Sequence, residues 1–248
     1  MVLAQTDSTN AHAARLAQQG TVGPIWILGL AQTAARGRRG RHWEMAPGNF
    51  AATLLMAPQG APATAALRSF VAALALYDAL ADALSAVGAD PASRLSLKWP
   101  NDVLLDDGKV AGILLESNSG PQGRSVQHLA VGIGVNLIAA PAMAAVELGA
   151  VCPVSLTGQG GPEILPEPFL AVLAGHFALW EAQLTHHGFA PIRQAWLARA
   201  ARLGQKVVAR LPGGEIAGRF DGIDDTGALL IETAQGRETI AAADVFFA

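Results

Sequence analysis

Residues 32–43 read Gln32-Thr33-Ala34-Ala35-Arg36-Gly37-Arg38-Arg39-Gly40-Arg41-His42-Trp43, and four of the chain's fourteen arginines fall within six positions of this segment. Its glycines and polar residues exclude a regular helix or strand, yet apolar segments at 25–30 and 50–56, typical of buried strands, flank it. Arginine presents a planar set of donors to phosphate or carboxylate, and glycine lets backbone amides approach an anion. The segment therefore predicts an anion-binding loop inside a domain, which we call the arginine loop (residues 36–43).

Arginine and glycine runs are also common in disordered tails that bind RNA through phosphate contacts. Such tails lie at chain ends or in long polar stretches, whereas this loop joins two predicted strands. A non-enzymatic nucleotide or RNA binder is the alternative hypothesis from another functional class. Trp43, two residues after the last arginine, could stack on a base in either case.

A second candidate site is the segment Leu97-Lys98-Trp99-Pro100-Asn101-Asp102, which holds one of only three lysines in the chain. Many lysines at strand ends simply extend into solvent. Here Pro100 ends a short apolar strand and forces the preceding residue into an extended conformation, which fixes the directions of Lys98, Asn101 and Asp102. Together with the arginine loop, a rigidly placed lysine indicates phosphoryl chemistry on a nucleotide.

The hydrophobic pattern predicts helices and strands in alternation. Ser8 or Thr9 caps a helix that runs to about Gln19, and Pro62 opens a long helix whose apolar face reaches Val87. We expect strands at 25–31, 50–56 and 126–137, and a hairpin over 102–116 with its turn at 106–108. Further helices are predicted from Pro166 and in the segment marked by Ile192, Trp196 and Leu203.

From Gly204 onward the pattern changes to short β segments separated by turns. They lie at 206–211, 215–223, 228–232, 237–240 and near Val245. About forty-five residues of strand predict a small SH3-like barrel, which is too small to be very stable alone and should dock on the larger domain.

Composition limits the class of protein. Hydrophobic residues make up 51% and charged residues 15% of 248, which predicts a compact globular chain, and the net charge of −3 argues against a general nucleic-acid binder. The single Cys152 excludes an internal disulfide, and we expect a buried thiol. Since no signal-type segment opens the chain and the most apolar helix carries Arg68, Asp78 and Asp82, we expect a cytoplasmic protein without a membrane span.

Five blocks in this order resemble the biotin protein ligases. They read Asp7-Ser8-Thr9-Asn10, then Arg36 to Trp43 followed by Pro47-Gly48-Asn49, Lys98-Trp99-Pro100-Asn101-Asp102, Lys109-Val110-Ala111-Gly112-Ile113-Leu114-Leu115-Glu116, and Gly132-Ile133-Gly134-Val135-Asn136. Any one block alone would be weak evidence. The resemblance implies an α+β fold in which a mixed-sheet biotin/lipoate ligase catalytic domain over 1–203 precedes an SH3-like domain over 204–248.

The resemblance also implies the activity. Biotin protein ligases join biotin to ATP as biotinyl-5'-AMP, with Mg²⁺ present, and transfer the biotinyl group to a lysine of a biotin carboxyl carrier domain. By family position, Lys98, Arg38 and Asp102 are the expected catalytic residues, with Lys98 between carboxylate and α-phosphate. The expected biotin- and nucleotide-binding residues are Ser8, Thr9, Asn10, Gln32, Arg36, Gly37, Arg38, Arg41, Trp43, Lys98, Asn101, Gly132, Gly134 and Asn136.

Individual roles follow the same resemblance. Ser8, Thr9 and Gln32 match contacts to the ureido ring of biotin, and Gly132 and Gly134 would leave room for the ligand. Asn136 matches an adenine contact and Trp43 a stacking lid. Asn101 and Asp102 would orient Lys98 or hold Mg²⁺ through water, although magnesium would come mostly with the triphosphate, so no metal ligand is assigned.

One departure and several open points accompany the resemblance. Ala35 stands where the family usually has glycine, which could exclude a positive-φ backbone there. The chain starts only a few residues before Asp7, so we expect no DNA-binding winged helix and no specific DNA binding. A lipoate protein ligase shares the fold and the adenylation logic and remains a second alternative. The sequence leaves a monomer and a homodimer equally open.

Overall fold

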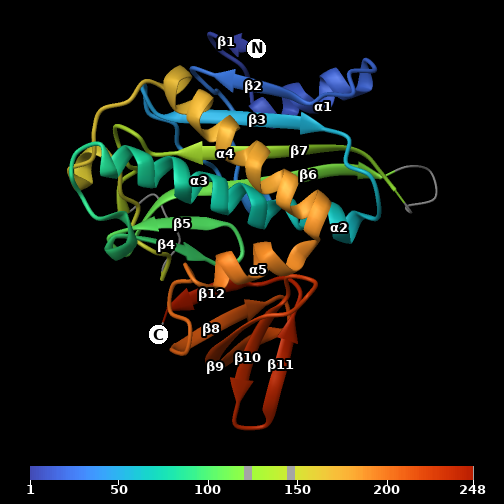
Figure 1. The fold of residues 1–248 in the computed structure, drawn as a ribbon, viewed down its shortest axis with the longest axis vertical. Coiled ribbons are helices and arrows are strands. Elements are labelled where there is room, and N and C mark those ends of the chain that lie inside the picture. The colour runs from blue at the N-terminus through green and yellow to red at the C-terminus, as the bar shows by residue number, and fades with distance from the viewer. Residues whose placement is uncertain (120–124, 144–148, 248) are drawn as a thin grey trace.

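The computed structural model describes residues 1–119, 125–143 and 149–247, and these form two β-sheets with five α-helices (Figure 1). The larger sheet has the strand order β1-β2-β3-β7-β6-β5-β4, and the smaller has the order β11-β10-β9-β8-β12. The larger sheet consists of β1 (Val2–Leu3), β2 (Ile25–Gly29), β3 (Phe50–Met56), β4 (Leu95–Lys98), β5 (Asp102–Leu105), β6 (Gly108–Ser119) and β7 (Val126–Val135).

The larger sheet is mixed, because β1 pairs parallel to β2 while the other neighbours are antiparallel. Helices α3 (Arg68–Ser85) and α4 (Pro166–His187) cover one face, drawn in front in Figure 1. Helix α1 (Thr9–Gln18) packs on β3 and β7 from the other side. Since α1 is short, it covers only part of that face, and the remainder is free to form a site.

The predicted long helix is divided at Leu67 into α2 (Pro62–Ala66) and α3. Over Pro62–Ser85 it is long and apolar enough to cross a membrane, but 72% of its apolar window is buried inside the molecule, as in the core helix of a globular protein. Arg68, itself buried, forms an ion pair with Glu181 of α4 at 2.6 Å. The helix is therefore a buried core helix that packs on the sheet and on α4.

The smaller sheet consists of β8 (Lys206–Leu211), β9 (Gly214–Ile223), β10 (Leu229–Thr233), β11 (Gly236–Ile240) and β12 (Asp244–Phe247). As predicted, it docks on the larger unit: Trp99 Nε1 donates to the carbonyl of Gly227 at 3.0 Å, and Trp196 of α5 (Phe189–Leu197) meets Phe220 edge-on. One hydrophobic cluster runs through both sheets. The α+β fold with a second small sheet is confirmed, and the domain boundary between 203 and 204 stays a prediction.

Local sequence signals account for several ends of these elements. The Ser8 hydroxyl accepts a hydrogen bond from the Ala11 amide and caps α1 as predicted. Asp106 and Asp107 have φ of 49° and 61°, the left-handed values that a tight hairpin turn needs between β5 and β6. Leu203 lies outside α5 and is exposed, so the prediction for that helix reached too far.

The expectation of a buried thiol is wrong, because Cys152 is exposed. It lies in an irregular segment that runs beside the start of β6, where its backbone carbonyl accepts from the Lys109 amide at 2.8 Å. The backbone pairing fixes this segment without burying the side chain. The prediction relied on the general tendency of cysteine to be buried, which does not depend on the position in the fold.

Candidate active site

A cavity of about 510 Å³ opens on the face of the larger sheet that α1 leaves uncovered. The arginine loop, the start of α1 and the strands β4 to β7 contribute to its wall, and β12 of the smaller sheet closes it. All of the predicted site residues line it, namely Ser8, Thr9, Asn10, Gln32, Arg36, Gly37, Arg38, Arg41, Trp43, Lys98, Asn101, Asp102, Gly132, Gly134 and Asn136.

Strand register explains why these distant residues meet. Lys98 pairs with Asp102, Asp102 with Gly112, Gly112 with Gly134, and Gly134 with Ala51. Residues directly opposite in antiparallel strands share a face. A single row across β4, β5, β6, β7 and β3 therefore forms the floor of the cavity, with charge at the β4 end and small residues elsewhere.

A second row, one pleat along the strands, forms an uncharged polar end. Gly132 pairs with Thr53, whose buried hydroxyl lies 2.6 Å from Asn10 Oδ1 and 2.8 Å from Thr9 Oγ1. Gln32 Oε1 accepts from the Thr9 amide at 2.8 Å. These side chains are buried or half-buried hydrogen-bonding groups without formal charge, which suits a neutral, polar part of a ligand.

The glycines leave less open space than the sequence suggests. A Cβ on Gly132 would lie 2.2 Å from Asn10 Oδ1, and a Cβ on Gly134 would lie 2.8 Å from the ring of Trp43. The space next to these strand positions is therefore filled by protein side chains, and the glycines are required so that Asn10 and Trp43 can lie against the sheet. Whether the same positions contact a ligand stays a prediction.

The arginine loop closes on itself at its base. The Gly37 amide donates to the Arg41 carbonyl at 2.8 Å, and the Trp43 amide donates to the Ala35 carbonyl at 3.1 Å. Between them Arg38–Gly40 form a short 3-10 turn, which the sequence analysis did not predict. Ala35 does not have a positive φ and is buried, so alanine fits where the family usually has glycine.

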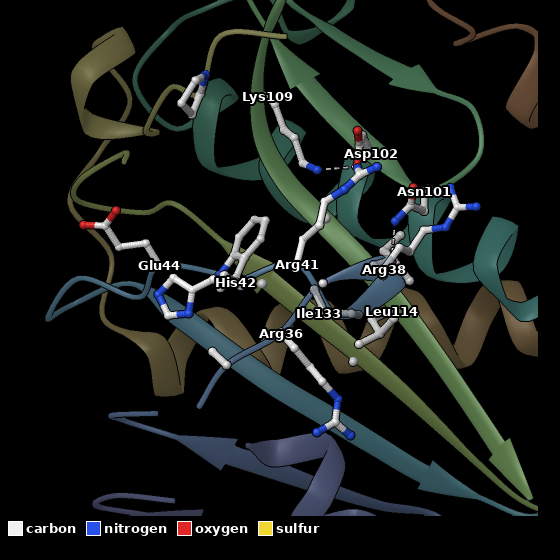
Figure 2. Close-up of a pocket in the computed structure, with 18 of the residues that line it drawn as sticks. Arg36, Arg38, Arg41, His42, Glu44, Asn101, Asp102, Lys109, Leu114 and Ile133 are labelled. Atoms are coloured by element: carbon white, nitrogen blue, oxygen red, sulfur yellow. Dashed lines mark hydrogen bonds and ion pairs between the residues drawn. The ribbon is translucent and has the colours of Figure 1, made fainter. Parts of the chain in front are cut away.

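Charged partners of the arginine loop come from far along the chain. Arg36 extends away from Lys109 and Asp102 (Figure 2) and pairs with Glu116 of β6 at 3.0 Å. Glu116 Oε2 also accepts from Asn10 Nδ2 at 2.8 Å, so one carboxylate joins the loop to the uncharged end. The other arginines meet Asp244 of β12: Arg39 Nη1 lies 2.9 Å and Arg38 Nη1 3.9 Å from its oxygens, and Arg41 Nη2 also contacts it.

Two lysines share one buried carboxylate at the cationic end. Asp102 Oδ1 lies 2.7 Å from Lys109 Nζ, an approach visible in Figure 2, and Asp102 Oδ2 lies 3.8 Å from Lys98 Nζ. Lys98 is only 8% exposed, so it does not extend into solvent. Asn101 Nδ2 donates to the Ile113 carbonyl at 2.6 Å and fixes the turn that leads into β5.

Burial and charge oppose each other in this cluster. Burial lowers the pKa of Lys98, and the attraction of Asp102 only partly offsets it. Burial by itself would raise the pKa of Asp102, but the charges of Lys109 and Lys98 outweigh it, so the pKa of Asp102 is lowered. Asp102 is therefore held as a carboxylate, and its charge in turn favours the protonated form of Lys98.

Asn136 follows β7 at the far side of the cavity floor. Its Nδ2 donates to the Val154 carbonyl at 3.0 Å, whereas its buried Oδ1 accepts no hydrogen bond from the residues that the structure describes. A buried acceptor left without a donor costs free energy, so this oxygen is suited to a donor on a ligand.

Sequence reasoning missed several residues of the wall, among them Lys109, Asp244 and Phe246. Lys109 was quoted within a matching block but given no role, although its place at the start of β6 beside Asp102 could have been inferred from the hairpin. Asp244 and Phe246 also line the cavity. No local pattern distinguishes them, because their place depends on how the smaller sheet docks.

Comparison with known proteins identifies the fold and the family. Residues 2–136, more than half of the chain, match the biotin/lipoate A/B protein ligase family. The chain belongs to this family. Residues 203–248 match the biotin protein ligase C-terminal domain, so the small sheet at the end of the chain is the one that accompanies biotin protein ligases.

Individual members of this ligase family resemble the chain over nearly its whole length. It is 58% identical to biotin–[acetyl-CoA-carboxylase] ligase of Paracoccus denitrificans over 99% of both chains. It is 30% identical to the bifunctional ligase/repressor BirA of Bacillus subtilis, covering 96% of this chain and 70% of that protein. Among solved structures, the biotin protein ligase of Aquifex aeolicus in complex with biotin and ATP has a TM-score of 0.79, at 23% identity, covering 100% of this chain and 98% of the other.

Proposed function

We propose that this protein is an ATP-dependent biotin protein ligase. It forms biotinyl-5'-AMP and transfers the biotinyl group to one lysine of the biotin carboxyl carrier domain of acetyl-CoA carboxylase. The proposal is supported by the Paracoccus denitrificans relative of that name, whose whole length the chain matches. The structural observation that carries it is the division of one cavity into an uncharged polar end and an end lined by arginines and lysines.

In the first step a carboxylate oxygen of biotin attacks the α-phosphorus of ATP, and pyrophosphate leaves with the electrons of the broken P–O bond. Two anions must meet, so fixed positive charge at the meeting point lowers the barrier. Lys98 and Lys109 supply it from the strand floor, and Arg38 and Arg41 supply it from the loop. Because Lys98 is buried, its charge is less screened than that of a surface lysine.

Ligand binding divides between the two ends. Thr9, Asn10 and Gln32 receive the ureido ring of biotin, with Ser8 beside them at the start of α1. Trp43 and Asn136 receive the adenine ring, the first by stacking and the second through its unpaired Oδ1. Residues 132 and 134 of β7 and residue 136, which directly follows the strand, lie two apart, so these contacts follow the cavity floor over about 13 Å at the usual rise per residue of a strand.

In the second step the carrier lysine attacks the carbonyl carbon of biotinyl-5'-AMP, an amide bond forms and AMP leaves. Asp102 is a poor proton acceptor, because its lowered pKa makes it a weak base. Its role is to hold Lys98 and Lys109, and the proton of the attacking amine passes to solvent or to the leaving phosphate.

Among the residues that the structure describes, we find no preformed magnesium site in this cavity. The residues that the structure describes hold no group of three or more side chains with metal-binding chemistry, and both oxygens of Asp102 face lysines. A lysine-paired carboxylate does not fit a dedicated cation ligand. We therefore propose that Mg²⁺ enters as part of the nucleotide, bound by its phosphates.

ATP–pyrophosphate exchange tests the proposal. The purified protein, ATP, Mg²⁺ and labelled pyrophosphate are incubated with biotin, with lipoate, or with neither acid. Exchange with biotin alone supports the ligase, exchange with lipoate identifies a lipoate ligase, and no exchange with either acid would contradict the adenylation reaction.

Labelling of a carrier domain tests the second step. With biotin, ATP and Mg²⁺, the protein should modify a biotin carboxyl carrier domain at one lysine and leave lipoyl domains nearly unmodified, without requiring DNA. We place this reaction in the cytoplasm, where ATP is available. An unlabelled carrier combined with retention of RNA or duplex DNA at physiological salt would favour the non-enzymatic binder.

A further inference from the structure

Asp244 occupies an unusual position for a residue of the smaller sheet, because its side chain meets the arginine loop of the larger unit. Its carboxylate is 10% exposed and lines the cavity. Arg39 and Arg38 lie 2.9 and 3.9 Å from its oxygens, Arg41 also contacts it, and Arg38 Nη1 donates to the neighbouring Ala243 carbonyl at 3.4 Å. One nearly buried carboxylate is therefore surrounded by three guanidinium groups.

This arrangement resolves the self-repulsion of the loop. Arg38, Arg39 and Arg41 lie within four positions of one another, and their positive charges would repel without a nearby anion. Asp102 cannot serve all of them, because Lys98 and Lys109 already face its two oxygens. Asp244, more than 200 residues away in the chain, supplies the negative charge.

A ligand can replace Asp244 as the partner of these arginines. The side chains of Arg39 and Arg41 are 43% and 46% exposed although Asp244 is only 10% exposed, so a ligand can reach both guanidinium groups from solvent. A polyphosphate brings several charges and many acceptor oxygens to the same guanidinium groups. It can therefore compete with a single carboxylate for them.

We propose that Asp244 is a positioning residue that takes the place of the polyphosphate while the cavity is empty. It holds the arginine loop at the cavity mouth, and ATP must displace it to gain the loop arginines. This inference rests on the proposed function for the identity of the nucleotide. It adds that the smaller sheet controls access of the polyphosphate to the loop.

Competition between Asp244 and the polyphosphate for the loop arginines has a measurable effect on ligand affinity. A group that competes with a ligand for the same partners lowers the affinity for that ligand, and removal of the competitor raises it. Asp244→Asn keeps the shape of the side chain and removes its charge. We expect this variant to bind inorganic triphosphate at least about fivefold more tightly than the wild type, the lower end of typical couplings between sites.

The same variant should release the loop in the absence of ligand. Without its counter-charge the loop repels itself, so trypsin should cleave faster after Arg38, Arg39 and Arg41. Added triphosphate should restore protection. Competition predicts that the variant binds triphosphate more tightly and that its ligand-free loop is cleaved faster. Structural damage would instead weaken triphosphate binding while it speeds loop cleavage.

The experiment measures triphosphate binding by calorimetry and loop cleavage by mass spectrometry. Asp221→Asn is the matched control, because Asp221 lies in the same sheet and pairs with Arg219 and Arg237 at 3.2 and 2.5 Å, away from the loop. This control should behave as the wild type, and Asp244→Glu should largely restore wild-type binding. If Asp244→Asn does not fold, Asp244→Ser takes its place.

Unchanged or weaker triphosphate binding in the charge-removing variant would overturn the proposal, as would unchanged loop cleavage. Neither measurement needs biotin or turnover. Failure of biotin-dependent exchange with these results intact would therefore count against the ligase reaction and not against the role of Asp244.

Discussion

At the residue scale, the cross-strand pair of Lys98 and Asp102 is central to the site. Lys98 is the last residue of β4 and Asp102 is the first of β5. Because both side chains are buried, each charge is stabilised by the opposite charge of its partner. The sequence predicted both residues and their rigid placement, because Pro100 leaves few conformations open. It gave no role to Lys109, whose charge reaches Asp102 only through the hairpin register.

Lys98→Ala should slow biotinyl-adenylate formation by about 10² or more, the usual effect of losing one preorganised electrostatic donor. Single-turnover kinetics with biotin and ATP would measure it. Lys206→Ala is the control, since Lys206 is exposed at the start of β8 and does not line the cavity. Near-wild-type rates for the Lys98 variant would remove this lysine from the mechanism.

Asp102→Asn should shift the alkaline limb of the exchange reaction. The pKa of Lys98 is already below its usual value because of burial, and Asp102 raises it. Without that carboxylate the pKa falls further, so Lys98 loses its charge at lower pH and the rate declines earlier as pH rises. The pH–rate profile of exchange would show this.

Asp107→Asn is a control for that shift, because it makes the same charge change at a side chain that is 73% exposed and pairs with Arg202. If both variants have the same alkaline limb as the wild type, Lys98 does not have to carry its charge during the reaction.

At the element scale, β7 brings the parts of the site together. Gly132 lies against Asn10, Gly134 lies against Trp43, and Asn136 follows the last residue of the strand. The sequence predicted the strand and the importance of its glycines. It could not show that side chains of α1 and the arginine loop fill the space beside these glycines, because the position of α1 and the loop over the strand is a tertiary feature.

Gly132→Ala should weaken biotin binding by about tenfold or more while the fold is kept. The added methyl group would meet Asn10 Oδ1 at 2.2 Å, and this side chain can rotate away only by breaking its contacts with Thr53 and Glu116. Loss of hydrogen bonds to a ligand at one buried polar group is worth about 1–3 kcal/mol.

Calorimetry with biotin would measure the change. Gly213→Ala is the matched control, since a Cβ there meets nothing within 4 Å. Equal biotin affinity in Gly132→Ala and Gly213→Ala would place the biotin ring elsewhere.

At the scale of the whole molecule, two sheets share one hydrophobic core and one cavity. The sequence predicted a small barrel docked on a larger unit, because a short run of strands cannot be stable alone. It could not predict that Asp244 reaches the arginine loop, since that contact spans more than 200 residues and follows from docking geometry. In the structure, Glu116 and Asp244 anchor the arginine loop through ion pairs.

Trp99→Phe should lower the free energy of unfolding by about 1–3 kcal/mol, the cost of leaving a buried carbonyl without its donor. Trp99 is 4% exposed, and its Nε1 donates to the Gly227 carbonyl, which joins the larger unit to the smaller sheet. Urea denaturation would measure the change. Trp180→Phe removes a comparable bond to Asp78 within the larger unit. Because Trp180 is less buried, a larger loss there than at Trp99 would contradict this account of docking.

Because the neutral and cationic ends of the cavity are separate, the choice of acid and its activation can be altered separately, except at Asn10, whose partner Glu116 also pairs with Arg36. Substitutions at Thr9 and Gln32 can alter which carboxylic acid is admitted, because no hydrogen bond or ion pair among the described residues joins these two side chains to Lys98, Lys109 or Asp102. A library of variants at these neutral positions would therefore test which new carboxylic acids are accepted while the residues that bind the phosphates are unchanged. Accepted acids could then be attached to carrier lysines as unnatural tags.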